Sequence, residues 1–139
     1  MKENLLINSL KSGIRVSETG NKAKFLLFLL KHKFRIPITF ILPANLYDDY
    51  LHDKQGFLDL LRNEVQSLPQ KPYAIRSSAK SEDTDQFSCA GQYQTITNVE
   101  GVDNILKAVI DVWESESLLK ENAYHRKFTN RSRGCAVLI

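Results

Sequence analysis

The stretch that decides the fold reads Tyr73-Ala-Ile-Arg-Ser-Ser-Ala-Lys-Ser-Glu-Asp83 and, after a short polar gap, Ser88-Cys-Ala-Gly-Gln-Tyr-Gln-Thr-Ile-Thr-Asn-Val99. Its first part, residues 73–77, predicts a strand that carries Arg76 near its end. Residues 78–88 are rich in Ser, Asp and Glu and predict a loop. Residues 92–99 alternate with β-branched side chains and predict a second strand. A cation, a loop and a strand in this order favour a hairpin that grips a phosphate group.

Hydrophobic periodicity predicts further elements on both sides of this hairpin. We expect helices over residues 22–33, 44–51, 56–68, 102–118 and 117–128, and strands over residues 36–42 and 134–139. The first helix is apolar on most faces from Phe25 to Leu30, so we expect it to be largely buried. Helices and strands mix without a regular βαβ alternation, which predicts an α+β fold.

The composition is that of an ordinary globular domain. The chain has 139 residues, 42% of them hydrophobic and 25% charged, which fits one domain or part of one. A net charge of +3 does not by itself indicate a nucleic-acid partner. Cys89 and Cys135 lie far apart, which is typical of free thiols in a reducing compartment. With no signal-peptide pattern and no apolar run of membrane-spanning length, we expect a cytoplasmic protein without a membrane partner. The apolar end at residues 134–139 suggests truncation.

Arg76 and Lys22 are the candidate phosphate ligands. A guanidinium presents a planar fork of donors and keeps its charge, so Arg76 is suited to bidentate phosphate binding. The alternative is that Arg76 lies on a solvent-facing strand edge or pairs with Glu82 or Asp83. Lys22 comes at an expected helix start, where free N–H groups and the helix dipole favour anions. The alternative for Lys22 is an ordinary exposed lysine.

The loop over residues 88–94 is the third candidate element. Gly91 would let backbone N–H groups approach a phosphate closely, and Ser88 and Gln92 can donate side-chain hydrogen bonds. A single glycine matches no P-loop pattern, so the alternative is a plain β-hairpin with a long loop.

The remaining polar groups favour neither a metal site nor a nucleic-acid site. Glu82 and Asp83 are adjacent carboxylates on a loop, which are more often solvated or capping groups than ligands. The three histidines lack neighbours at ligand spacing, so we expect no metal ligands in this chain. The basic cluster at residues 125–133 could touch nucleic acid, but it is more typical of a solvated helix end.

Five short motifs together resemble the nucleotide-binding domain of phosphoenolpyruvate synthase and pyruvate phosphate dikinase, a domain also found in rifampicin phosphotransferases. They are Gly20-Asn-Lys-Ala23, Ile36-Pro-Ile-Thr-Phe40, Arg76-Ser-Ser-Ala79 followed by Glu82-Asp83, Ser88-Cys-Ala-Gly-Gln92, and Asn98-Val-Glu-Gly101. The resemblance covers nearly the whole chain. It departs from the family pattern at Asn21, Thr39, Lys80 and Cys89.

The resemblance implies an ATP-grasp fold, with a mixed or antiparallel sheet and flanking helices, of which residues 1–139 are the N-terminal portion. It implies that Lys22 and Arg76 bind the triphosphate of ATP. Ser88, Gly91 and Gln92 would belong to a loop that closes over it, with Thr95 just beyond.

In the full-length relatives, a phosphoryl group passes from ATP through a histidine on a swivelling domain to pyruvate or another acceptor. The Mg²⁺ ligands and that histidine would lie outside this chain. The resemblance therefore implies that the partners are a nucleotide and the remaining domains, and that the isolated chain is inactive. The alternative is a non-catalytic or degenerate nucleotide-binding module.

Overall fold

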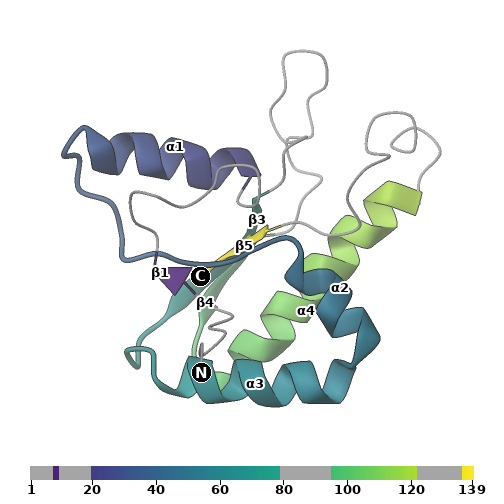
Figure 1. Cartoon of the computed structure of the whole chain (residues 1–139). Coiled ribbons are helices and arrows are strands. Elements are labelled where there is room, and N and C mark those ends of the chain that lie inside the picture. Colours follow the sequence, from purple (N-terminus) through teal and green to yellow (C-terminus); the bar gives the residue numbers. More distant parts are fainter. Residues whose placement is uncertain (1–7, 10–19, 79–94, 122–135) are drawn as a thin grey trace, which may run out of the picture.

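The computed structural model describes residues 8–9, 20–78, 95–121 and 136–139, and in them the expected α+β class is confirmed (Figure 1). The elements in chain order are β1 (Asn8–Ser9), α1 (Gly20–Lys31), β2 (Phe40–Leu42), α2 (Leu46–His52), α3 (Lys54–Gln66), β3 (Tyr73–Ser78), β4 (Thr95–Val99), α4 (Val102–Glu121) and β5 (Ala136–Leu138).

Most of the expected elements are confirmed, with three corrections. The strand expected over residues 36–42 begins only at Phe40, in keeping with Pro37, which has no N–H to donate to a sheet ladder. The separate helix expected over residues 117–128 is wrong at its start, because residues 117–121 continue α4; residues 122–128 lie outside the described part of the chain. The short strand β1 was not predicted, since two residues carry no periodic signal.

The described strands form one antiparallel sheet in the order β1-β2-β5-β3-β4. Strand β5 comes last in the chain but lies between β2 and β3, where Leu138 is paired with Ile41 on one side and with Arg76 on the other. All three residues of β5 are buried. Strand β3 is therefore an interior strand, so the alternative that placed Arg76 on a strand edge is wrong.

Helices α2, α3 and α4 cover one face of the sheet and enclose the larger core (Figure 1). Trp113 of α4 is completely buried at its centre. The ring centroids of Tyr47, Tyr50 and Phe57 lie 5.4–5.6 Å from that of Trp113, within the range of favourable aromatic pairs. This aromatic cluster joins the three helices to one another.

Helix α1 covers the opposite face of the sheet, over a smaller core (Figure 1). Its Ala23 is fully buried against Ile41, Ala136 and Leu138. The expectation that α1 is largely buried is wrong, because Phe25 is 60% exposed and Phe28 is 54% exposed. The physical reason is that, among the described elements, α1 is the only helix on its face, and the sheet beneath it covers only one side of it.

The carboxyl end of α1 is closed by a Schellman-type turn. The N–H of Phe34 donates to the carbonyl of Leu29 at 3.0 Å, and the N–H of Lys33 donates to the carbonyl of Leu30 at 3.1 Å. This turn places Lys33 at φ 63°, in the left-handed region that glycine adopts most easily.

We therefore expect the Lys33→Gly variant to be more stable than the natural chain by about 1 kcal/mol, because the left-handed conformation costs a side chain roughly that amount. Urea unfolding would measure it. Lys31→Gly, within the same helix, is the matched control and should lose about 1 kcal/mol. Equal stabilities of the two variants would contradict the strain assigned to Lys33.

Two core tyrosines make the fold sensitive to alkaline pH. Burial raises the pKa of Tyr73, and burial, followed by the charge of Glu114, raises the pKa of Tyr50. The folded chain thus holds these phenol protons more tightly than the unfolded chain, whose tyrosines ionise near pH 10.0.

The free energy of unfolding should consequently fall as the pH rises through 10.0, the pKa of an unfolded tyrosine, toward the raised pKa values of Tyr50 and Tyr73 in the folded chain. Urea unfolding from about pH 8 to about pH 11 would measure the fall, which should be smaller in a Tyr50→Phe variant. A fall of the same size in that variant would show that Tyr50 does not contribute.

Candidate functional site

Arg76 projects from β3 toward the face of the sheet that carries α1. Arg76 and Ser78 are paired with Leu138 and Ala136 of β5, and these two side chains belong to the core beneath α1. Ser77, between them, is paired with Val137 of the larger core on the other face. The alternation of side chains along a strand thus places Arg76 and Ser78 together under α1. Arg76 remains exposed, whereas Ser78 is only 1% exposed.

The start of α1 lies directly against Ser78. The N–H of Ala23 donates a hydrogen bond of 3.1 Å to the hydroxyl oxygen of Ser78. Gly20 has φ +74°, and a Cβ atom added to it would lie only 2.1 Å from the carbonyl oxygen of Ser78. Only glycine therefore permits this approach of the two backbones.

These contacts bring Lys22 to the same end of the sheet face as Arg76. Lys22 lies in the first turn of α1, between Gly20 and Ala23, which both contact Ser78. Arg76 lies two residues before Ser78 on the same strand face. Two cationic residues and the positive end of a helix dipole at the same end of one sheet face form an arrangement that can bind an anion such as a phosphate chain.

Thr95 also belongs to this region. It is exposed at the start of β4 and lies directly opposite Arg76 in the β3–β4 pair. Residues opposite each other in an antiparallel pair project to the same face, so Thr95 and Arg76 lie on the same side of the sheet. Ser88, Gly91 and Gln92, together with Glu82 and Asp83, lie outside the described residues.

The sequence indicated the two cations but not the contact of Ser78 with α1, and it presented Gly20 only as part of a motif. The signal for both was a small residue at a position where two backbones approach closely. That signal could not be interpreted without knowing that α1 meets the end of β3.

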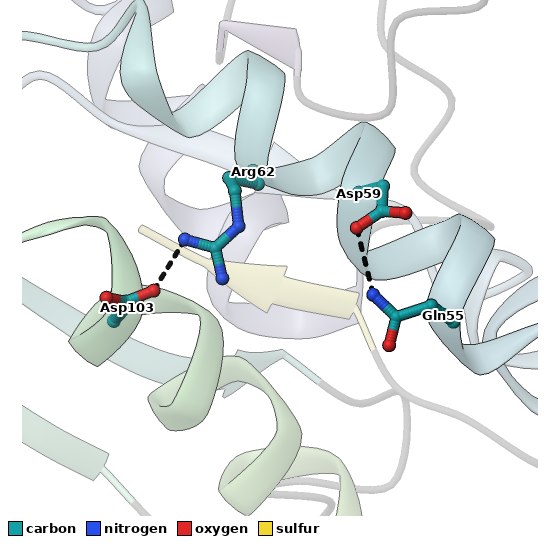
Figure 2. Close-up of polar contacts among 4 residues, drawn as sticks. All are labelled: Gln55, Asp59, Arg62 and Asp103. Carbon is teal, nitrogen blue, oxygen red and sulfur yellow. Dashed lines mark hydrogen bonds and ion pairs between the residues drawn. The ribbon is translucent and has the colours of Figure 1, made fainter.

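The opposite side of the sheet carries a separate set of polar contacts, in a groove between α3 and α4. Figure 2 shows Arg62 of α3 paired with Asp103 of α4, and Gln55 donating to Asp59 within α3. Each of these four side chains has a protein partner, and the Arg62–Asp103 pair joins α3 to α4 at their exposed rim. An exposed ion pair of this kind contributes at most about 1 kcal/mol.

The described residues contain no group of three or more His, Cys, Asp or Glu side chains that could hold a metal ion. None of the described helices combines the length and the apolar character needed to cross a membrane.

The contact between Gly20 and Ser78 can be tested with two glycines that share a left-handed backbone. We expect Gly20→Ala to lose about 2 kcal/mol or more, because the new Cβ clashes with a backbone carbonyl and the φ angle is strained. Gly101, at φ +86°, has no atom within 4 Å of an added Cβ. Gly101→Ala should therefore lose only the free energy that a left-handed backbone costs a residue with a side chain, about 1 kcal/mol.

Urea unfolding of both variants would measure the difference. Amide hydrogen exchange in α1 should also become faster in Gly20→Ala and stay unchanged in Gly101→Ala. If the two variants lost equal stability, the close approach of α1 to β3 would be contradicted.

Comparison with known proteins identifies the family of the chain. The family model of the pyruvate phosphate dikinase AMP/ATP-binding domain matches residues 55–139. An uncharacterized phosphotransferase of Bacillus subtilis, YvkC, is 29% identical over 133 residues, covering 81% of this chain and 16% of its own length.

Two further relatives match shorter segments. The rifampicin phosphotransferase of Bacillus subtilis is 49% identical over 61 residues, which are 41% of this chain and 7% of that enzyme. The phosphoenolpyruvate synthase of Pseudomonas aeruginosa is 48% identical over 42 residues, which are 30% of this chain and 5% of that enzyme. The chain thus spans at most 16% of the length of these relatives. Since the family model covers more than half of the chain, the chain belongs to the pyruvate phosphate dikinase AMP/ATP-binding domain family.

Proposed function

We propose that this chain binds the triphosphate of ATP through Lys22 and Arg76. We further propose that it is the N-terminal portion of the ATP-binding domain of a larger phosphotransferase. The observation that carries the proposal is the joint position of the two cationic residues, on one face of the sheet, where α1 begins against the end of β3. Membership of an AMP/ATP-binding domain family supports the identity of the ligand.

The two cations would have different tasks. Arg76 lies on an interior strand held on both sides by β4 and β5, so its backbone is fixed while its guanidinium remains exposed. A fixed guanidinium can bind two phosphate oxygens in a bidentate manner. Lys22 would add a compact positive charge at the helix N-terminus, where the dipole already favours anions.

The segment between β3 and β4 would cover the phosphates from the other side. Ser88, Gly91 and Gln92 belong to it in our proposal, with Thr95 at its end. The proposal is supported by the two ends of the segment, because Ser78 and Thr95 both lie beside Arg76 on the same face. A segment that starts and ends beside Arg76 is well situated to close over a ligand bound there.

In the complete protein, the phosphoryl group would move from ATP to a histidine of another domain and then to pyruvate or a related acceptor. Phosphoryl transfer depends mainly on positioning and on neutralising negative charge, and Lys22 and Arg76 would supply both. Mg²⁺ normally accompanies ATP in such reactions. The described residues at the site are cationic or neutral and do not fit a metal ion. In our proposal its ligands lie in the remaining domains of the larger protein.

The proposal predicts that Arg76→Ala binds ATP at least about ten times more weakly than the natural chain, because charge-assisted hydrogen bonds contribute about 1.5–3 kcal/mol. Lys22→Ala should also weaken binding. Isothermal titration calorimetry with ATP would measure the affinities, and circular dichroism would show that the fold is kept.

Arg62→Ala is the matched control, since it removes another exposed arginine, with its ion pair to Asp103, from the opposite side of the sheet. Its affinity for ATP should equal that of the natural chain. Unchanged ATP affinity in Arg76→Ala would reject the role assigned to this residue.

A further inference from the structure

We propose that Ser78 is a positioning residue of the phosphate site, because its hydroxyl and carbonyl groups fix the Lys22-bearing turn of α1 relative to Arg76. This inference rests on the proposed function and adds to it a residue that does not itself carry charge.

A buried hydrogen bond joins Ala23 of α1 to Ser78. The N–H group of Ala23 donates to the Ser78 hydroxyl at 3.1 Å, and both residues are almost completely buried. A buried bond of this kind matters because water cannot replace the lost acceptor. Ala23 follows Lys22 directly in the chain, so a shift of its backbone also shifts Lys22.

A close steric contact also joins Gly20 of α1 to Ser78. A Cβ at Gly20 would lie 2.1 Å from the carbonyl oxygen of Ser78 and 2.7 Å from its hydroxyl oxygen. The Ser78 backbone therefore limits how closely α1 can approach the strand, while the hydroxyl bond limits how far α1 can move away or slide. One serine thus constrains the first turn of α1 in two ways.

Strand β3 holds Ser78 at a fixed distance from Arg76 because it is paired on both sides. Ser78 is paired with Ala136 of β5, and Arg76 is paired with Leu138 of the same strand and Thr95 of β4. Two residues of an extended strand span about 6.6 Å, which fixes the separation between the backbones of Arg76 and Ser78. Ser78 is therefore tied to Arg76 through the strand and to Lys22 through the bond to Ala23.

The neighbouring Ser77 distinguishes positioning from ordinary core packing. Ser77 is the next residue on the same strand, is fully buried, and is also a serine, but it faces the larger core beneath α4. Removing either hydroxyl perturbs a buried polar group. Only the removal at Ser78 alters the contact that holds α1.

The experiment compares Ser78→Ala with Ser77→Ala in the full chain and measures affinities for ATP, ADP and AMP by calorimetry, with urea unfolding in parallel. We expect Ser78→Ala to lower the ratio of ATP affinity to AMP affinity about fivefold, the effect of losing one hydrogen bond. In the proposal, the longer phosphate chain of ATP contacts both Lys22 and Arg76, so its binding depends on the relative position of these two residues. Ser77→Ala should lose stability but keep the ratio.

Amide hydrogen exchange gives a readout that needs no nucleotide. Exchange at Ala23 should become faster in Ser78→Ala and stay unchanged in Ser77→Ala. If Ser78→Ala does not fold, Ser78→Cys keeps most of the side-chain volume but provides a poor acceptor, and it should lower the affinity ratio in the same direction.

The outcomes separate the two proposals. If the natural chain binds ATP and the ratio is unchanged in the Ser78 variant, the positioning role is overturned while the proposed function stands. If the ratio falls equally in the Ser77 variant, the effect is general destabilisation and the positioning role is again overturned. If the natural chain does not bind ATP, the proposed function fails and this inference fails with it.

Discussion

The contact between the start of α1 and the end of β3 is the constraint on which the candidate site depends. Without it, the position of Lys22 on α1 would not be fixed relative to the position of Arg76 on β3. The contact requires a residue without a side chain at Gly20 and a small hydroxyl side chain at Ser78. Larger groups at either position would separate the backbones, so chemistry at the site depends on two residues that carry no charge.

The sheet supports this contact because its two faces are used differently. The larger core, with Trp113 at its centre, fastens α2, α3 and α4 to one face. The other face carries α1 over a small core and leaves Arg76 exposed beside it. Most of the apolar surface is therefore buried away from the cationic site. Substitution of an exposed cation at the site should thus change ligand binding far more than it changes the free energy of unfolding.

Several features could be predicted from the sequence because their causes are local. The strand that carries Arg76 and the amphipathic helix α4 were both predicted, since alternation and helical periodicity are visible in a short window. The five short motifs together also predicted the family, which the comparisons confirm. The position of Lys22 at the start of a helix was predicted as well.

Other features depend on contacts between distant segments and were missed. Nothing in the residues of β5 indicates that it lies between β2 and β3, because strand order is set by the packing of the whole sheet. The apolar character of α1 predicted burial on all sides, but the geometry of one helix on one sheet leaves Phe25 and Phe28 exposed. The role of Ser78 was missed for a related reason. A serine in a strand has many ordinary uses, and the sequence does not show that β3 meets α1, where the Ser78 hydroxyl accepts a hydrogen bond from the N–H of Ala23. A site of this kind is specified less by its charged residues than by the small residues that let two backbones meet.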